Sequence, residues 1–362
     1  MKIIEVKVSI VEVESYTGSA RGRTFQNVLV QVLTDEGISG DFFGWGDHQS
    51  GRVMADTVAG TFRPLLIGRD PFDREIIWQQ MMGRAIAGHI SMAAIGAVDL
   101  ALWDIAGKVA GRPVYKLLGG FRDKIRAYAS PAQQSSPQAY AELCCELVAK
   151  GYTAIKLHVS GGPREHIAAC HAARKAVGDD VDLMLDSHCR YDRREALLVG
   201  RELEKLRFYF YEEPLPNTDV EGYRELCQAL DIPVAATETM YFADAAHFVP
   251  YVVNHIADIV RPDAKYGITM TKKVADLCES FGFKFELHGF GFAACQFANL
   301  NIMGACRNTD FFEKILPDEH YNACSKDTVQ IDKEGYVHMP TKPGLGLELD
   351  FDELKKRTVT AL

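Results

Sequence analysis

Short apolar runs recur along the middle of the chain, and each of them ends in a polar side chain. The residues that end six successive runs are Lys156, Asp186, Glu212, Glu238, Asp263 and His288. Their spacing of 25 to 30 residues matches the length of one strand followed by one helix. Helical spacing of apolar positions fills the intervals, for example at 137–150 and 193–206. This alternation predicts parallel strands in an α/β fold.

Eight such strands are predicted between positions 125 and 313. The six runs cover 154–158, 181–186, 208–212, 233–238, 258–263 and 283–288, with a first strand at 125–129 and a last one at 309–313. A (β/α) barrel keeps its chemistry at the carboxyl ends of its strands. We therefore expect the polar residues that end the runs to converge at one mouth of such a barrel.

The regions on either side of the predicted barrel have a different pattern. Polar and apolar residues alternate at the N-terminus, which predicts β-strands, and helical spacing takes over at 53–114. Residues 329–349 return to short strands and turns. We expect a capping domain at 1–124, a catalytic barrel at 125–328, and a C-terminal segment at 329–362 that returns to the capping domain.

Length, charge and cysteine content narrow the class of protein. The 362 residues suit a barrel of about 250 residues with a smaller partner domain. A formal charge of -9 argues against a nucleic-acid partner, which needs a basic face. The nine cysteines include no Cys-x-x-Cys pair, as is typical of reduced thiols in a cytoplasmic protein. The sequence has neither a signal-peptide pattern nor an apolar run that could span a bilayer, so we expect no membrane partner.

Three of the polar strand ends are carboxylates on consecutive strands: Asp186, Glu212 and Glu238. Buried together without a partner they would repel one another, at a cost of several kcal/mol each. A divalent cation removes this repulsion, and oxygen ligands favour Mg²⁺. The alternative, three surface or salt-bridged carboxylates, is disfavoured by their common register. The sequence therefore predicts a Mg²⁺ site.

Two histidines stand beside these strand ends. Lys156 and His158 are two residues apart on one strand and so share a face, and the same holds for Asp186 and His188. Either pair can project both members into the barrel mouth. A lone histidine at a strand end is more often structural than catalytic, so the weight of each comes from its neighbours.

A base next to a metal site indicates one type of reaction. Asp263 ends the run before that of His288, and a carboxylate there would orient the imidazole and raise its basicity. A metal ion that holds a substrate carboxylate takes up the negative charge that develops when the α-proton leaves. A lysine or histidine base combined with Mg²⁺ is the pairing used by enolase-superfamily enzymes.

Sequence motifs spread over nearly the whole chain carry a family resemblance. The segment 97–108, followed by Gly111-Arg-Pro-Val114 and Leu117-Leu-Gly-Gly120, and the strand-end motif Glu212-Glu-Pro-Leu215 both resemble the mandelate racemase branch of the enolase superfamily. The resemblance implies a (β/α)7β TIM-like barrel. It also implies an α+β capping domain formed by the N-terminal region and the C-terminal tail.

The resemblance also implies a role for individual residues. The metal ligands that it implies are Asp186, Glu212 and Glu238, with one Mg²⁺ per subunit. Asp263 and His288 correspond to the base dyad of the family. Glu313, on the eighth strand, is similar to the glutamate that hydrogen-bonds the substrate carboxylate.

Two positions depart from the family pattern. The second barrel strand of the family reads Lys-x-Lys, and its second lysine is a base, whereas this chain reads Lys156-Leu-His158. Racemisation by two bases is therefore less favoured, although His158 stays a candidate base. The loop that follows Asp263 is one or two residues shorter than usual. Lys265 in this loop is either a substrate contact or a solvated side chain, and we favour the solvated state.

The motif at the end of the third barrel strand helps to choose between the possible reactions. Asp186-Ser-His188 is similar to the Asp-x-His of sugar-acid dehydratases in this branch, where the histidine is the general acid. Dehydration needs an acid because hydroxide is a poor leaving group. We expect His288 to take the α-proton and His188 to protonate the β-hydroxyl, with a structural role for His188 as the alternative. Lys156 and Glu313 would assist at the carboxylate.

Two N-terminal loops are candidates for substrate specificity, because the cap loops of this family close over the barrel. The loops cover 15–23 and 46–52. The candidate substrate-binding residues in them are Tyr16, Arg21, Arg23, His48 and Arg52. Arginines bind carboxylates and hydroxyls, but each of these is equally well explained as a solvated side chain.

The leading hypothesis is Mg²⁺-dependent dehydration of a sugar acid, a small carboxylate, to a 2-keto-3-deoxy acid. A racemase, an epimerase or a lactone cycloisomerase would use the same enediolate and is the first alternative. A non-catalytic metal-binding relative is the second, and its mark would be a lost ligand or base. Relatives of this kind are often multimers, so we expect a homo-oligomer.

Overall fold

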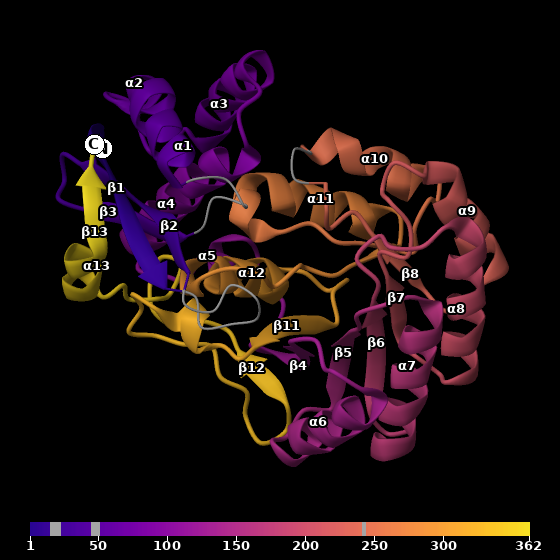
Figure 1. The fold of residues 1–362 in the computed structure, drawn as a ribbon. Coiled ribbons are helices and arrows are strands. Elements are labelled where there is room, and N and C mark those ends of the chain that lie inside the picture. The colour runs from indigo at the N-terminus through magenta and orange to yellow at the C-terminus, as the bar shows by residue number, and fades with distance from the viewer. Residues whose placement is uncertain (15–22, 45–50, 241–243) are drawn as a thin grey trace.

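The fold has two parts, which Figure 1 shows as a small sheet with helices beside it and a curled sheet surrounded by helices. The computed structural model describes residues 1–14, 23–44, 51–240 and 244–362. The small sheet is antiparallel and the curled sheet carries eight parallel strands. The predicted fold class, a TIM-like barrel with an α+β cap, is confirmed.

The antiparallel sheet of the cap has the strand order β13-β1-β2-β3. Its strands are β1 (Ile3–Glu14), β2 (Thr24–Thr34), β3 (Ser39–Gly44) and β13 (Thr358–Ala361). Alternation along β1 buries Val6, Val8 and Ile10 on one face. The helical elements that follow in the chain are α1 (Gly51–Asp56), η2 (Thr57–Phe62), α2 (Arg63–Leu66), α3 (Arg74–Gly88) and α4 (Met92–Ala110). The apolar side chains of these helical elements pack against this face of the sheet.

Helix α4 joins the cap to the rest of the molecule. The Ser91 hydroxyl caps its first turn by accepting from the Ala93 amide, and the helix ends at Gly111, whose φ of 62° suits glycine. Asp104 on α4 accepts from the amide of Asp41 in β3 at 3.1 Å and from that of Leu345 at 2.9 Å. One buried carboxylate therefore ties the cap sheet to the C-terminal segment.

The barrel strands follow the order β10-β9-β8-β7-β6-β5-β4-β11. They are β4 (Lys124–Pro131), β5 (Ala154–His158), β6 (Asp182–Asp186), β7 (Phe210–Glu212), β8 (Val234–Ala236), β9 (Ile259–Val260), β10 (Lys284–Phe285) and β11 (Phe311–Leu316). The helices around them are α5 (Val114–Leu117), α6 (Pro137–Ala149), α7 (Pro163–Val177), α8 (Arg193–Lys205), α9 (Val220–Ala229), α10 (Ala245–Val253), η3 (Ala264–Tyr266), α11 (Ile268–Ser280) and α12 (Ala293–Ala305).

Three barrel strands end earlier than the sequence predicted. β8, β9 and β10 end before Glu238, Asp263 and His288, which lie in the loops that follow. In β9 the reason is Pro262, which has no amide hydrogen to continue the ladder. These loops lie at the carboxyl ends of the strands, which is the end of a (β/α) barrel where functional side chains gather.

The seam between β10 and β11 is closed by a side chain as well as by the backbone. The Phe285 amide donates to the Asn308 carbonyl at 3.0 Å. The buried carboxylate of Glu286 accepts from the Asp310 amide at 2.7 Å, the Thr309 hydroxyl at 3.0 Å and the Phe311 amide at 3.2 Å. Glu286 thus holds the start of β11 against the end of β10.

The C-terminal segment contacts both parts of the molecule. β12 (Tyr336–His338) pairs antiparallel with β4 of the barrel, and β13 pairs with β1 of the cap after η4 (Glu319–Asn322) and α13 (Phe351–Arg357). The last residue, Leu362, donates its amide to the Val8 carbonyl of β1 at 2.9 Å. The domain boundaries stay a prediction.

All nine cysteines are free thiols. Among the helices of the described residues, none combines the length and apolar character that a bilayer crossing requires.

Candidate active site

The interior of the barrel is built in layers. The apolar layer consists of Tyr128, Ala154, Met184, Phe210, Ala235, Ile259 and Phe311. Side chains along a strand alternate, so the residues two positions further on point the same way and form the next layer. They are Ser130, Lys156, Asp186, Glu212, Arg261 and Glu313, and all of them are buried. The polar site thus rests on an apolar floor.

Glu238 reaches this layer through a break in the alternation. The residue two positions after Ala235 is Thr237, and its φ of 85° is an unusual value for a β-branched residue. The Thr237 hydroxyl accepts from the Arg261 amide at 2.9 Å, which holds the turn in place. Glu238, one position later, therefore joins Glu212 and Asp186.

The three predicted metal ligands come together. One carboxylate oxygen from each of Asp186, Glu212 and Glu238 lies within 4.8 Å of the others. Burial raises the pKa of Glu212 well above its usual range. Burial is the largest influence on Glu238 and opposes its ionisation, but His288, a hydrogen bond with Glu212 and the charge of Lys156 together outweigh it and lower the pKa of Glu238 to about 2. A cation held by all three would stabilise their ionised forms, and hard oxygen donors suit a divalent ion such as Mg²⁺.

Two buried cations already neutralise part of this charge. Lys156 Nζ lies 2.8 Å from Glu212 Oε2, 2.8 Å from Glu313 Oε1 and 3.8 Å from Asp186 Oδ2. Arg261 contacts Glu212 through Nε and lies 2.8 Å from Glu313 Oε2 and 3.5 Å from Glu238 Oε2. Sequence reasoning missed Arg261. The signal in the sequence was the position of this arginine within an apolar strand. Arg261 also stands two positions before Asp263, and side chains two positions apart in a strand share a face.

Glu313 is held from several sides. Its Oε1 accepts from the Ser130 hydroxyl at 2.8 Å, and its Oε2 accepts from the Gly289 amide at 2.9 Å. A Cβ on Gly289 would lie 2.6 Å from the Glu313 side chain, so glycine permits the approach. Burial opposes ionisation, but Lys156 and Arg261 outweigh it and hold the pKa of Glu313 well below its usual range.

The predicted base dyad is assembled at the edge of the carboxylate group. His288 Nδ1 lies 3.0 Å from Asp263 Oδ2, and Nε2 lies 3.2 Å from Glu238 Oε1. Asn299 donates to the His288 carbonyl at 2.7 Å and fixes the loop. Lys265 Nζ also lies 3.0 Å from Asp263 Oδ2, and the residue is only 6% exposed. The expectation that Lys265 is solvated was wrong, because this ion pair draws the side chain inward.

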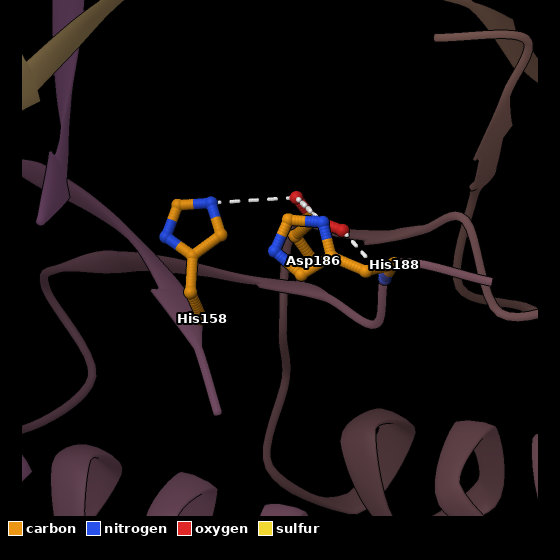
Figure 2. A group of neighbouring side chains, drawn as sticks. All are labelled: His158, Asp186 and His188. Atoms are coloured by element: carbon orange, nitrogen blue, oxygen red, sulfur yellow. Dashed lines mark hydrogen bonds and ion pairs between the residues drawn. The ribbon is translucent and has the colours of Figure 1, made fainter. Parts of the chain in front are cut away.

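His158 and His188 flank Asp186, and Figure 2 shows both imidazoles beside its carboxylate. His158 Nε2 lies 3.3 Å and His188 Nδ1 lies 3.4 Å from Asp186 Oδ2. His188 has a φ of 49°, and its amide donates to Asp186 Oδ1 at 2.9 Å. Burial lowers the pKa of His188, despite the charge of Asp186.

The candidate specificity residues of the cap are only partly described. Tyr16, Arg21 and His48 lie outside the described residues. Arg23 is exposed just before β2. Arg52 pairs with Asp56 one turn later in α1 at 2.8 Å. The roles of these five residues in substrate binding stay predictions.

Two family descriptions match most of the chain. Residues 3–119 match the mandelate racemase / muconate lactonizing enzyme N-terminal domain, and residues 139–354 match the enolase C-terminal domain-like family. The D-galactonate dehydratase of Variovorax paradoxus (strain S110) is 32% identical over 357 residues, which cover 90% of both chains. The arabinonate dehydratase of Saccharolobus solfataricus is 29% identical over 339 residues, again 90% of both.

Solved structures agree with this assignment. A D-glucarate dehydratase from Agrobacterium tumefaciens complexed with magnesium has a TM-score of 0.90 and 31% identity, and the match covers 99% of this chain and 100% of that one. A 3,6-anhydro-D-galactonate cycloisomerase from Zobellia galactanivorans has a TM-score of 0.88 and 27% identity, with the same coverage. Dehydratases are lyases, and this chain is an enzyme of the lyase class. It belongs to the mandelate racemase/muconate lactonizing enzyme family of the enolase superfamily.

Proposed function

We propose that this enzyme dehydrates a sugar acid, a 2,3-dihydroxy carboxylate, to a 2-keto-3-deoxy acid with the help of Mg²⁺. The observation that carries the proposal is the pair of imidazoles on different sides of the carboxylate group. His288 adjoins Glu238, and His188 adjoins Asp186. A dehydration needs a base and an acid at neighbouring carbons. The names of the dehydratase relatives support the same reaction.

Asp186, Glu212 and Glu238 are the proposed metal ligands. Bound there, Mg²⁺ supplies a Lewis acid that stabilises negative charge on the carboxylate of the substrate. Lys156 and Glu313 lie next to these ligands and are proposed to position that carboxylate. The Nζ of Lys156 donates a hydrogen bond to it, and Glu313 holds that ammonium in place through their 2.8 Å ion pair.

His288 is the proposed base. Asp263 accepts a hydrogen bond from Nδ1–H of the imidazole, which leaves the lone pair on Nε2, on the side of the ring that faces the Glu238 carboxylate. Nε2 then takes the α-proton of the substrate, and the electrons of the broken C–H bond form the enediolate. The ion pair with Lys265 holds Asp263 in this orientation. Asp263 and Lys265 together therefore favour the tautomer of His288 that carries its hydrogen on Nδ1.

His188 is the proposed acid. A protonated imidazole at this position gives its proton to the β-hydroxyl, the C–O bond breaks, and water leaves. The resulting enol becomes the 2-keto-3-deoxy acid. Burial lowers the pKa of His188, and this makes its protonated form a stronger acid toward the departing oxygen.

A library screen tests the proposal. Monoacid and diacid sugars are incubated with the enzyme and Mg²⁺, and 2-keto products are detected with semicarbazide. We expect turnover of at least one sugar acid. A family isomerase is the alternative, and α-proton exchange in D₂O on some carboxylate, with no keto product from any sugar acid, would favour it instead.

The His288→Asn variant provides a control for the chemistry. We expect it to lose α-proton exchange and product formation together, because the asparagine amide has no basic nitrogen. Mg²⁺ binding, measured by calorimetry, should persist because His288 is not a proposed ligand. Undiminished turnover would remove His288 from the mechanism. A homo-oligomeric state and a cytoplasmic location stay predictions.

A further inference from the structure

Asp186 faces two imidazoles in addition to the carboxylates below it. His158, at the end of β5, and His188, two residues beyond β6, approach the same oxygen, Asp186 Oδ2, at 3.3 and 3.4 Å. Their rings are stacked, with centroids 5.2 Å apart and planes 17° apart. One ligand atom from each of the three residues lies within 4.8 Å of the others. Figure 2 shows this triad, which contains two nitrogen donors and one oxygen donor.

One hydrogen bond of His158 shows which of its two ring nitrogens carries the hydrogen. His158 Nδ1 lies 3.0 Å from the Pro131 carbonyl oxygen, and a carbonyl can only accept. Nδ1 therefore carries the hydrogen, and in a neutral imidazole Nε2 presents its lone pair to Asp186 Oδ2. Two acceptors at this distance repel one another unless a positive charge lies between them. That charge is either a second proton on His158 or a metal ion.

Three features of the triad favour a metal ion. Metal-binding histidines commonly donate their other ring N–H to a backbone carbonyl, as His158 does to Pro131. Neighbouring ligands at bonds of about 2.1 Å in tetrahedral geometry are about 3.4 Å apart, close to the spacing of the His nitrogens from Oδ2. The His188 side chain is 39% exposed, so an ion can reach it from solvent.

We propose that His158, Asp186 and His188 form a second cation site, which takes a transition-metal ion such as Zn²⁺ and thereby inhibits the enzyme. Imidazole nitrogens suit Zn²⁺, Co²⁺, Ni²⁺ and Cu²⁺, whereas the all-oxygen group of Asp186, Glu212 and Glu238 suits Mg²⁺. The two sites share Asp186. The inhibition rests on the proposed function, because an ion on His188 prevents that residue from protonating the leaving hydroxyl.

Cu²⁺ serves as the probe for the site itself. Mg²⁺-loaded enzyme is titrated with Cu²⁺, and electron paramagnetic resonance counts the nitrogens that couple to the ion. We expect one Cu²⁺ per chain with two coupled nitrogens. The His158→Asn and His188→Asn variants should each show one fewer. The matched control is His171→Asn, an exposed histidine beside Glu202, which should leave both nitrogens.

The spectroscopic outcomes separate the triad from its neighbours. A spectrum without coupled nitrogens would overturn the proposal and assign the charge beside His158 to a proton. Coupling that persists unchanged in both the His158→Asn and His188→Asn variants would also overturn it, and would place the ion beside His288 instead. Neither result depends on turnover, so this experiment decides the site even if the proposed dehydration fails.

Inhibition is measured with Zn²⁺ at saturating Mg²⁺, on the substrate that the library screen identifies. We expect one equivalent of Zn²⁺ to abolish product formation, and additional Mg²⁺ not to restore it. The residual activity of His158→Asn should be at least tenfold less sensitive to Zn²⁺. Restoration by Mg²⁺ would contradict the inhibitory site, because it would mean that Zn²⁺ only replaces Mg²⁺ among the three carboxylates.

Discussion

At the scale of single residues, the site is a balance of buried charges. Its carboxylates are Asp186, Glu212, Glu238, Asp263 and Glu313, and its cations are Lys156, Arg261 and Lys265. With neutral histidines, two negative charges are left over, which one divalent ion balances. Removing one partner from a buried ion pair is costly because the other charge stays uncompensated. The metal and the two long cations therefore act on the same set of carboxylates.

Removal of Arg261 should disturb this balance, because its guanidinium contacts three of the carboxylates. Arg261→Met leaves Glu212 and Glu313 without their shared guanidinium, and we expect the free energy of unfolding to fall by about 3–5 kcal/mol. Urea denaturation measures the change. The control is Arg193→Met, because Arg193 pairs with Asp219 on the surface, where such pairs contribute little to stability. Equal small losses in both variants would contradict the role assigned to Arg261.

At the scale of elements, the strand ends explain both the success and the limits of sequence reasoning. Lys156 lies within a regular strand and Asp186 and Glu212 end theirs, so alternation alone puts the three in one layer. Glu238 joins them only through the left-handed turn at Thr237, which no periodicity reports. Arg261 was overlooked because an arginine within an apolar run was not assigned to the interior. Lys265 was misjudged since its ion pair with Asp263 depends on the fold of one short loop.

The seam between β10 and β11 gives a prediction on pH. Burial, reinforced by Asp310, raises the pKa of Glu286 to about 7 from 4.5. A folded state that retains this proton loses stability as the pH rises from 4.5 to about 7, by about 3 kcal/mol in total. In Glu286→Gln this loss should be absent. Urea denaturation of both proteins across that pH range tests it, and parallel curves would refute the assignment.

At the scale of the whole molecule, helix α4 connects the cap, the barrel and the C-terminal segment. Asp99 on α4 accepts from the Thr269 amide at the start of α11 at 3.0 Å, and Asp104 accepts from the Asp41 and Leu345 amides. The cap therefore does not rest on the barrel through apolar packing alone.

Asp104→Ala tests this connection. The variant leaves the buried amides of Asp41 and Leu345 without an acceptor, and each costs about 1–3 kcal/mol. We expect a loss of about 2–5 kcal/mol in the free energy of unfolding. Asp276→Ala, which removes an exposed partner of Lys272 on α11, should change it by less than about 1 kcal/mol. Similar values for the two variants would mean that Asp104 does not join the parts.

The central claim is that one histidine removes the α-proton and another delivers a proton to the leaving hydroxyl. The most direct measurement compares α-proton exchange with 2-keto product formation in D₂O, for wild type and His188→Asn on the same sugar acid. We predict that the variant keeps exchange within about tenfold while product formation falls by about 10²–10⁴, the usual contribution of a general acid. Equal loss of both rates would contradict the claim and leave His188 a positioning role.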